Sequence, residues 1–160
     1  MTDEEELAVL ISLGEELARE MLLVKRHKEL VPVYHLIGKE NDHHIMYCPW
    51  RNDFDKKLHF AAVRTHARKI GCRAFSFVSE GWSVMRPKDN PGGPQPRDDP
   101  NRIEIVNISA VNHSGAKTKH LHMVRDLSPG MNNRLIGLEL MSEINDARGP
   151  MLDGIVQKEV

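Results

Sequence analysis

Aromatic residues, cysteines and long apolar runs are scarce in this sequence, and each shortage argues against a class of protein. Aromatic side chains make up 5% of the 160 residues, so aliphatic side chains and methionine have to fill most of a core. Two cysteines, Cys48 and Cys72, are too few for a disulfide scaffold and do not form a CxxC metal motif. No apolar run approaches the roughly 20 residues of a transmembrane helix, and the acidic start does not resemble a secretory signal. We therefore expect a globular cytoplasmic protein that does not enter a membrane.

A strong net charge and the common nucleotide-binding motifs are also missing. The formal net charge is -1, so no overall positive field attracts nucleic acid or an anionic membrane surface. The sequence has no G-x-G-x-x-G or G-x-x-x-x-G-K-[ST] loop, and no serine lies in a G-x-S-x-G context. A local basic group remains as a candidate nucleic-acid contact, and the overall charge disfavours it: Arg64, Arg68, Lys69 and Arg73.

An amphipathic helix is predicted from Thr2 to about Leu30. Thr2 and Glu5 have the spacing of a capping box, and apolar residues recur after them with helical spacing. Further apolar side chains at Val9 and Leu13 widen the apolar stripe beyond one face of this helix. A second copy of the chain could pack there, so one expectation is a homo-oligomer formed through the N-terminal helix.

The following segments predict strands and one further helix. Two β-favouring runs flank the turn-rich residues 38–42 and predict a hairpin over residues 31–48. Asn52 is a suitable N-cap and Gly71 a suitable αL stop, so a second helix is expected between them. Three more strands are predicted, at residues 75–84, 103–112 and 118–125.

These elements predict an α+β fold in a single domain covering residues 1–160. A long N-terminal helix is followed by a β-hairpin, a second helix and then a mainly antiparallel sheet. Residues 86–101 are expected to form a loop, because their prolines remove backbone donors. The tail LIGLELMSEI, residues 135–144, suits either an edge strand or a short helix, and we expect a short helix or irregular packing.

Side-chain alternation divides the three later strands into an apolar and a polar face. In the first of these strands Phe75 and Phe77 share one face, whereas Glu80 and Trp82 share the other. If every apolar set covers a core beneath the helices, the polar sets collect on the opposite side of the sheet. The members of this predicted polar face are Glu80, Trp82, Asn107, Ser109, His120 and His122.

Three interpretations of the polar face are open. It is a solvated surface on which Glu80 pairs with a neighbour, or a divalent-metal centre, or a contact surface anchored by Trp82. The metal interpretation rests on the H-x-H spacing, which places both imidazoles on one face of a strand about 6.7 Å apart at the backbone, within reach of one ion. Such an ion activates water for hydrolysis. The contact interpretation rests on tryptophan, which combines a large buriable area with a donor nitrogen.

Three motifs follow one another along the chain: PWRNDFDKK at residues 49–57, FVSEGW at residues 77–82 and DPNRIEIV at residues 99–106. Their order resembles that in small uncharacterised proteins of bacteria and phages, in which a lysine-containing helix leads into an F-V-S-E-x-W strand and a later P-x-R-x-E-x-V strand. The resemblance extends from Val31 to Arg125 and implies no activity. It implies that the recurring pattern includes Glu80, Trp82, Arg102 and Glu104, and that it does not include His120 and His122.

Two functional hypotheses follow. The first is a non-enzymatic binding or accessory protein of bacterial or phage origin, which contacts a protein or small ligand through the exposed sheet face and the proline-rich loop and needs no cofactor. Its candidate binding residues are Glu80, Trp82, Arg102, Glu104 and Asn107. The alternative is a divalent-metal-dependent hydrolase or nuclease centred on Glu80, His120 and His122. The first hypothesis predicts no enzymatic activity and the second predicts hydrolysis, and the sequence is compatible with both.

Overall fold

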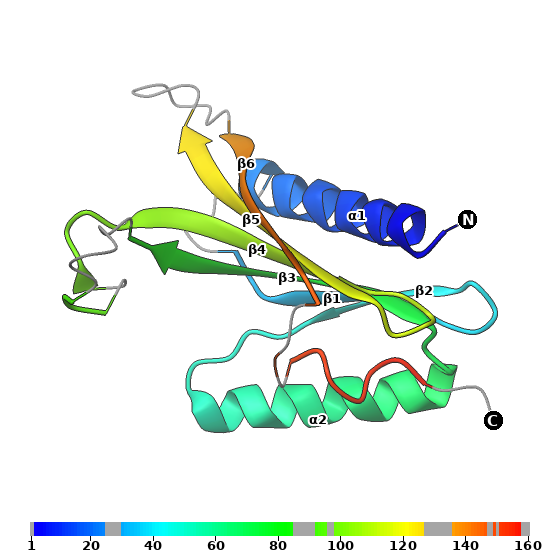
Figure 1. Cartoon of the computed structure of the whole chain (residues 1–160). Helices are drawn as coiled ribbons and strands as arrows, with labels where there is room; N and C mark the ends of the chain where they lie inside the picture. Colours follow the sequence, from blue (N-terminus) through cyan, green and yellow to red (C-terminus); the bar gives the residue numbers. More distant parts are fainter. Residues whose placement is uncertain are drawn as a thin grey trace.

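Two helices lie on opposite faces of one antiparallel sheet in the computed structural model, which describes residues 2–24, 30–84, 92–95, 98–126, 136–146, 149 and 151–157 (Figure 1). The elements follow in the order α1 (Asp3–Val24), β1 (Val33–Ile37), β2 (His43–Tyr47), α2 (Asp53–Ile70), β3 (Ala74–Ser83), β4 (Ile103–Val111), β5 (Lys117–Asp126) and β6 (Ile136–Asn145). The predicted α+β class and element order are confirmed. Within the described ranges, neither helix is both long and apolar enough to cross a membrane.

The sheet has six strands in the order β2-β1-β3-β4-β5-β6, so the first hairpin joins the later strands through the β1–β3 pair. The short helix or irregular packing expected in the tail is wrong, because residues 136–145 form the edge strand β6 against β5. Pairing with β5 satisfies backbone groups that would otherwise form an open edge. The pairing changes register after Leu121, and Met141 is the extra residue of the resulting bulge.

Capping residues begin and end the helices close to the predicted positions. The Asn52 side chain accepts a hydrogen bond from the Asp55 amide at 2.9 Å, and Gly71 ends α2 with a φ of 63°. Thr2 and Glu5 form the reciprocal capping box of α1. The predicted continuation of this helix to about Leu30 is wrong at Leu30, and residues 25–29 lie outside the described residues.

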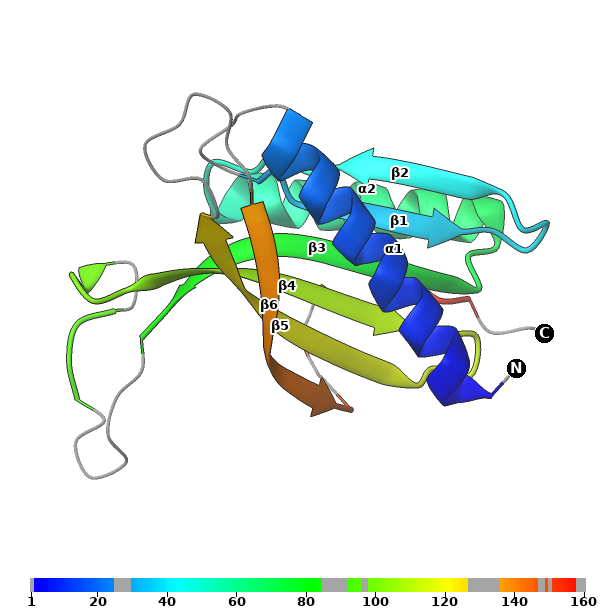
Figure 2. The same ribbon diagram turned by 90° about the horizontal axis from the view of Figure 1, so that it is seen from above.

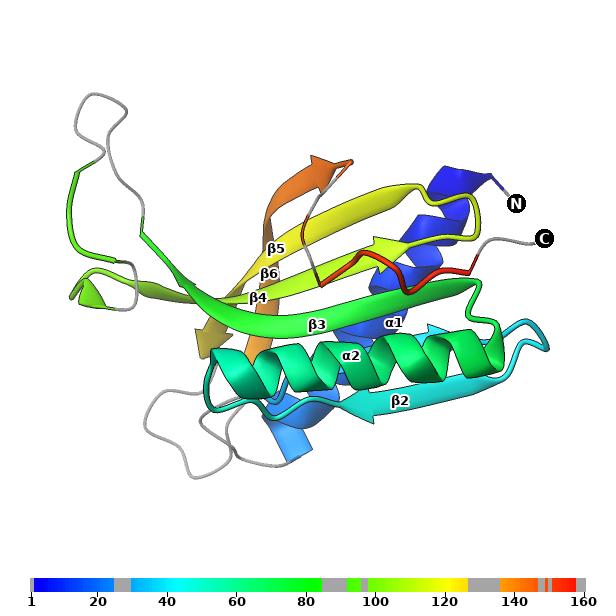
Figure 3. The same cartoon turned by 90° about the horizontal axis from the view of Figure 1, so that it is seen from below.

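The central strands are buried on both faces, whereas the edge strands β2 and β6 are largely exposed, so the single exposed polar face predicted for the sheet is wrong. On one face α1 packs across β3, β4, β5 and β6 (Figure 2). On the other face α2 and the C-terminal segment cover an aromatic cluster around Tyr34 and Phe77 (Figure 3). The Tyr34 hydroxyl donates to the Met151 carbonyl at 2.8 Å, which attaches this segment to the core. Phe77 pairs with Ser109, so Ser109 lies on the same face as Phe77 and not on the opposite face where it was predicted.

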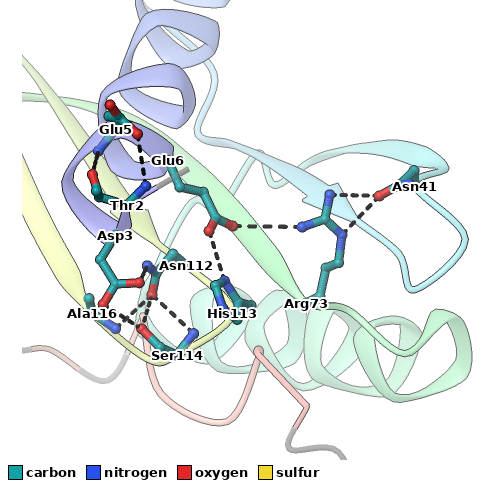
Figure 4. Close-up of polar contacts among 10 residues, drawn as sticks. All are labelled: Thr2, Asp3, Glu5, Glu6, Asn41, Arg73, Asn112, His113, Ser114 and Ala116. Carbon is teal, nitrogen blue, oxygen red and sulfur yellow. Dashed lines mark hydrogen bonds and ion pairs between the residues drawn. The ribbon is translucent and has the colours of Figure 1, made fainter.

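Polar contacts attach the start of α1 to the β4–β5 turn (Figure 4). The buried Asn112 amide donates to Asp3 at 2.7 Å. Glu6 lies 2.7 Å from the His113 ring nitrogen and 3.6 Å from the Arg73 guanidinium. These contacts determine which end of the sheet the helix starts from.

Gly14 is the point of closest approach between α1 and the sheet. A Cβ atom at this position would lie 2.5 Å from Ile108 Cγ2 and 3.3 Å from Val78 Cγ2. Ile108 is β-branched and fully buried, so its methyl group cannot move aside freely. Glycine therefore allows the helix to lie directly on β4.

We expect Gly14→Ala to lower the free energy of unfolding by about 1 to 2 kcal/mol, because overpacking outweighs the gain in helix propensity. Urea denaturation measures the change. Ser12→Ala, at an exposed position of the same helix, is the matched control and should be neutral or slightly stabilising. A Gly14→Ala variant as stable as Ser12→Ala would contradict the close approach.

Candidate metal centre

A carboxylate from α1 and two imidazoles from β5 meet beneath the helix. His120 pairs with Ile108 and His122 pairs with Val106, so both imidazoles lie on the face of the sheet that α1 covers. Glu15 follows Gly14 on α1, at the point where the helix lies closest to the sheet. We call these three residues, Glu15, His120 and His122, the Glu15–His120–His122 group.

The separations within this group suit the ligands of one ion. His122 Nε2 lies 3.1 Å from Glu15 Oε1, and one ligand atom from each residue lies within 4.8 Å of the others. The two imidazole centroids are 6.1 Å apart. Nitrogen and oxygen ligands about 2.1 Å from a metal are themselves about 3.0 to 3.5 Å apart in tetrahedral or octahedral geometry. The Glu15–His122 pair already has this spacing, and His120 needs a small side-chain movement.

The His122 imidazole is buried, and only one of its two ring nitrogens has a polar partner among the described residues. Its residue is 3% exposed, and burial lowers the pKa of its ring although Glu15 acts in the opposite direction. Among the described residues Nδ1 has no hydrogen-bond partner, whereas Nε2 contacts Glu15. The lowered pKa favours the neutral ring, which is the form of imidazole that coordinates a metal ion.

An open cavity of about 190 Å³ adjoins the group between α1 and the strands β5 and β6. His120 forms part of its wall, and the Glu143 carboxylate on β6 lies 3.9 Å from His120 Nε2. Glu143 is half exposed and is therefore accessible to a molecule in the cavity. The cavity thus gives water and a small ligand access to His120, whereas Glu15 and His122 are not among its described lining residues.

Glu80 does not complete the predicted Glu80–His120–His122 centre. It is in register with Val106, which pairs in turn with His122, so Glu80 and His122 are two strand spacings, or about 9.6 Å, apart. Its carboxylate instead accepts a hydrogen bond from the Leu30 amide at 3.1 Å. Glu80 therefore connects β3 to the chain segment that precedes β1.

Trp82, Arg102 and Glu104 lie together where β3 and β4 extend beyond the neighbouring strands (Figure 1). We call residues 80–83 and 102–105 the β3–β4 arm. The Arg102 guanidinium lies 4.8 Å from the centre of the Trp82 ring, and Trp82 remains 44% exposed. Asn107 is on the opposite face, where its amide would lie 3.3 Å from a Cβ atom at Gly81. Of the predicted loop at residues 86–101, only residues 92–95 and 98–101 are among those described.

Three other candidate sites on the described residues are weaker than the Glu15–His120–His122 group. A larger cavity, of about 330 Å³, lies along α2, and its described lining residues include neither histidine nor cysteine. The second acidic and histidine group, Asp3, Glu6 and His113, forms the contacts that hold α1 to the β4–β5 turn. Burial raises the pKa of both cysteine thiols to about 11, so neither is a nucleophile at neutral pH.

Glu15 is the member of the site that sequence reasoning missed. Helical spacing identified the apolar stripe of α1, and Glu15 lies at its margin as an ordinary polar residue. The isolated glycine before it was the available signal, because a glycine inside a helix often marks close packing.

No protein-family model matches the chain, no curated protein is significantly similar to it, and no solved structure matches its fold significantly. The resemblance to bacterial and phage proteins therefore stays a prediction. The function has to be inferred from the geometry described above.

We expect Glu80→Ala to lower the free energy of unfolding by about 1 to 3 kcal/mol, because the Leu30 amide loses its acceptor. Glu80→Gln keeps an acceptor oxygen in the same place and should cost less. Chemical denaturation of both variants measures the difference. Equal stabilities for Glu80→Ala and wild type would contradict the structural role assigned to this residue.

Proposed function

We propose that this protein binds a divalent transition-metal ion through Glu15, His120 and His122. The observation that carries the proposal is the convergence of one carboxylate and two imidazoles within 4.8 Å, beside an open cavity. Two imidazoles and one carboxylate favour zinc and its neighbours in the first transition series over magnesium or calcium, which prefer oxygen ligands.

A hydrolytic role is compatible with this ligand set. Catalytic zinc sites commonly have three protein ligands and leave a further position for water, whose pKa the ion lowers to about 7. The cavity beside His120 provides the space for such a water molecule. The metal-dependent hydrolase hypothesis is thus retained with Glu15 in place of Glu80.

We expect isothermal titration with zinc to give one site per chain, and Glu15→Gln or His122→Asn to weaken binding by at least about tenfold, because each removes one of three ligands. Glu15→Gln is isosteric and Glu15 is only partly buried, so the fold should be retained, which circular dichroism verifies.

Two control variants distinguish this site from its competitors. His113→Asn alters the other acidic and histidine group, and Glu80→Gln alters the carboxylate named by the sequence hypothesis. Both should bind zinc as the wild type does. A loss of binding in either control, together with normal binding by Glu15→Gln, would overturn the proposal.

A second candidate function is association with a protein through the β3–β4 arm. It is favoured by the exposed Trp82 ring and its contact with Arg102, since tryptophan and arginine are the residues most enriched among interface hot spots.

We expect Trp82→Ala to weaken association with such a protein by about 30-fold, the effect of losing a hot-spot residue worth 2 kcal/mol. Phe54→Ala removes another exposed aromatic ring, on α2, and serves as the matched control. Affinity measurements with a copurifying protein compare the variants. Equal losses for both substitutions would show that the arm has no special role.

A further inference from the structure

The cavity beside the Glu15–His120–His122 group has a distinctive distribution of charge. Its described lining residues are Glu4, Leu7, Ala8, Ile11, Thr118, His120, Glu143 and Asn145. Two of them are carboxylates and none is lysine or arginine. Apolar side chains of α1 form one wall, and polar groups of the strands form the other.

This distribution favours one class of ligand. The carboxylates of Glu4 and Glu143 attract a positively charged amine and repel a phosphate group. Enzymes that act on phosphodiesters commonly hold the phosphate with arginine or lysine in addition to a metal ion, and the described walls supply neither side chain. The apolar wall from Leu7 to Ile11 accommodates a small alkyl group.

The cavity is also small. Its volume of about 190 Å³ is below the range of roughly 300 to 1,000 Å³ typical of sites for larger organic ligands. A molecule the size of an amino acid, or one residue at the end of a longer molecule, fits this restriction.

Glu143 is in position to take part in proton transfer. Its carboxylate lies 3.9 Å from His120 Nε2 but does not belong to the group whose ligand atoms all lie within 4.8 Å of one another, so it is placed to contact a water molecule on the ion and not the ion itself. Glu4 lies on the opposite side of the same cavity, on the first turn of α1.

We infer that the metal centre hydrolyses a small amide that carries a free, positively charged amino group. The inference rests on the proposed metal site. Water adds through its oxygen to the carbonyl carbon and gives one proton to Glu143. The carbon–nitrogen bond then breaks, and the proton passes from Glu143 to the leaving nitrogen, so the products are a carboxylic acid and an amine. Glu4 binds the ammonium group of the substrate.

Three substrates test the inference with the zinc- or cobalt-loaded full chain: alanine p-nitroanilide, its N-acetyl derivative and bis(p-nitrophenyl) phosphate. We expect alanine p-nitroanilide to be cleaved with a kcat/KM about fivefold above that of the acetylated compound, the effect of one exposed ionic contact. The phosphodiester should not be cleaved. Preferential cleavage of the phosphodiester, or equal cleavage of the two anilides, would overturn the substrate assignment.

Two variants assign the roles of the carboxylates. Glu143→Gln should lower kcat by about 100-fold or more and leave the zinc dissociation constant unchanged, because it removes a proton acceptor and not a ligand. Glu4→Gln should raise KM for alanine p-nitroanilide only. An unchanged kcat in Glu143→Gln would refute its role in proton transfer.

The metal titration separates the two levels of inference. Stoichiometric zinc binding without cleavage of either anilide would overturn the hydrolytic inference and leave the metal site intact. The absence of zinc binding would overturn both.

Discussion

The close approach of α1 to β4 at Gly14 is the contact on which both the core and the candidate site depend. A Cβ atom there would lie 2.5 Å from Ile108, so any larger residue moves the helix or the strand. Ile108 pairs with His120 on the next strand, and residue 15 follows directly on the helix. The contact that closes the core therefore also brings Glu15 to the imidazoles of β5.

Packing of α1 across the sheet explains why a polar group lies beneath a helix. Because α1 crosses from β3 to β6, it covers His122 although that residue lies only one strand from the sheet edge. Burying an imidazole costs free energy unless its polar atoms find partners. Glu15 supplies a partner for Nε2, while Nδ1 has none among the described residues. Such an arrangement contributes little to stability, and buried titratable groups beside a cavity are typical of functional sites.

Local features of the fold could be predicted from sequence, whereas the pairing of faces could not. Asn52 and Gly71 determine the ends of α2 through their own side-chain and backbone chemistry, so they are readable without tertiary information. Alternation likewise identifies the two faces of each strand. It does not determine which face of one strand aligns with which face of the next, because that depends on register. The pairing of Phe77 with Ser109 puts on one face two residues that were predicted to lie on opposite faces. For β6, the bulge at Met141 interrupts the alternation that would have marked a strand.

The candidate site contains Glu15 and not the predicted Glu80, and this difference couples the site to the packing of α1. The predicted centre of Glu80, His120 and His122 would need only the strands β3 and β5 of the sheet, but the Glu15–His120–His122 group needs the helix to be packed on the sheet. In the unfolded chain Glu15 is separated from His122 by more than 100 residues, so the group exists only in the folded state. An ion bound there stabilises that state by mass action, in proportion to the logarithm of its concentration above the dissociation constant. On the proposed metal site, substitutions that loosen the helix at Gly14 are expected to weaken metal binding without touching a ligand, because helix packing and the placement of Glu15 depend on the same contact.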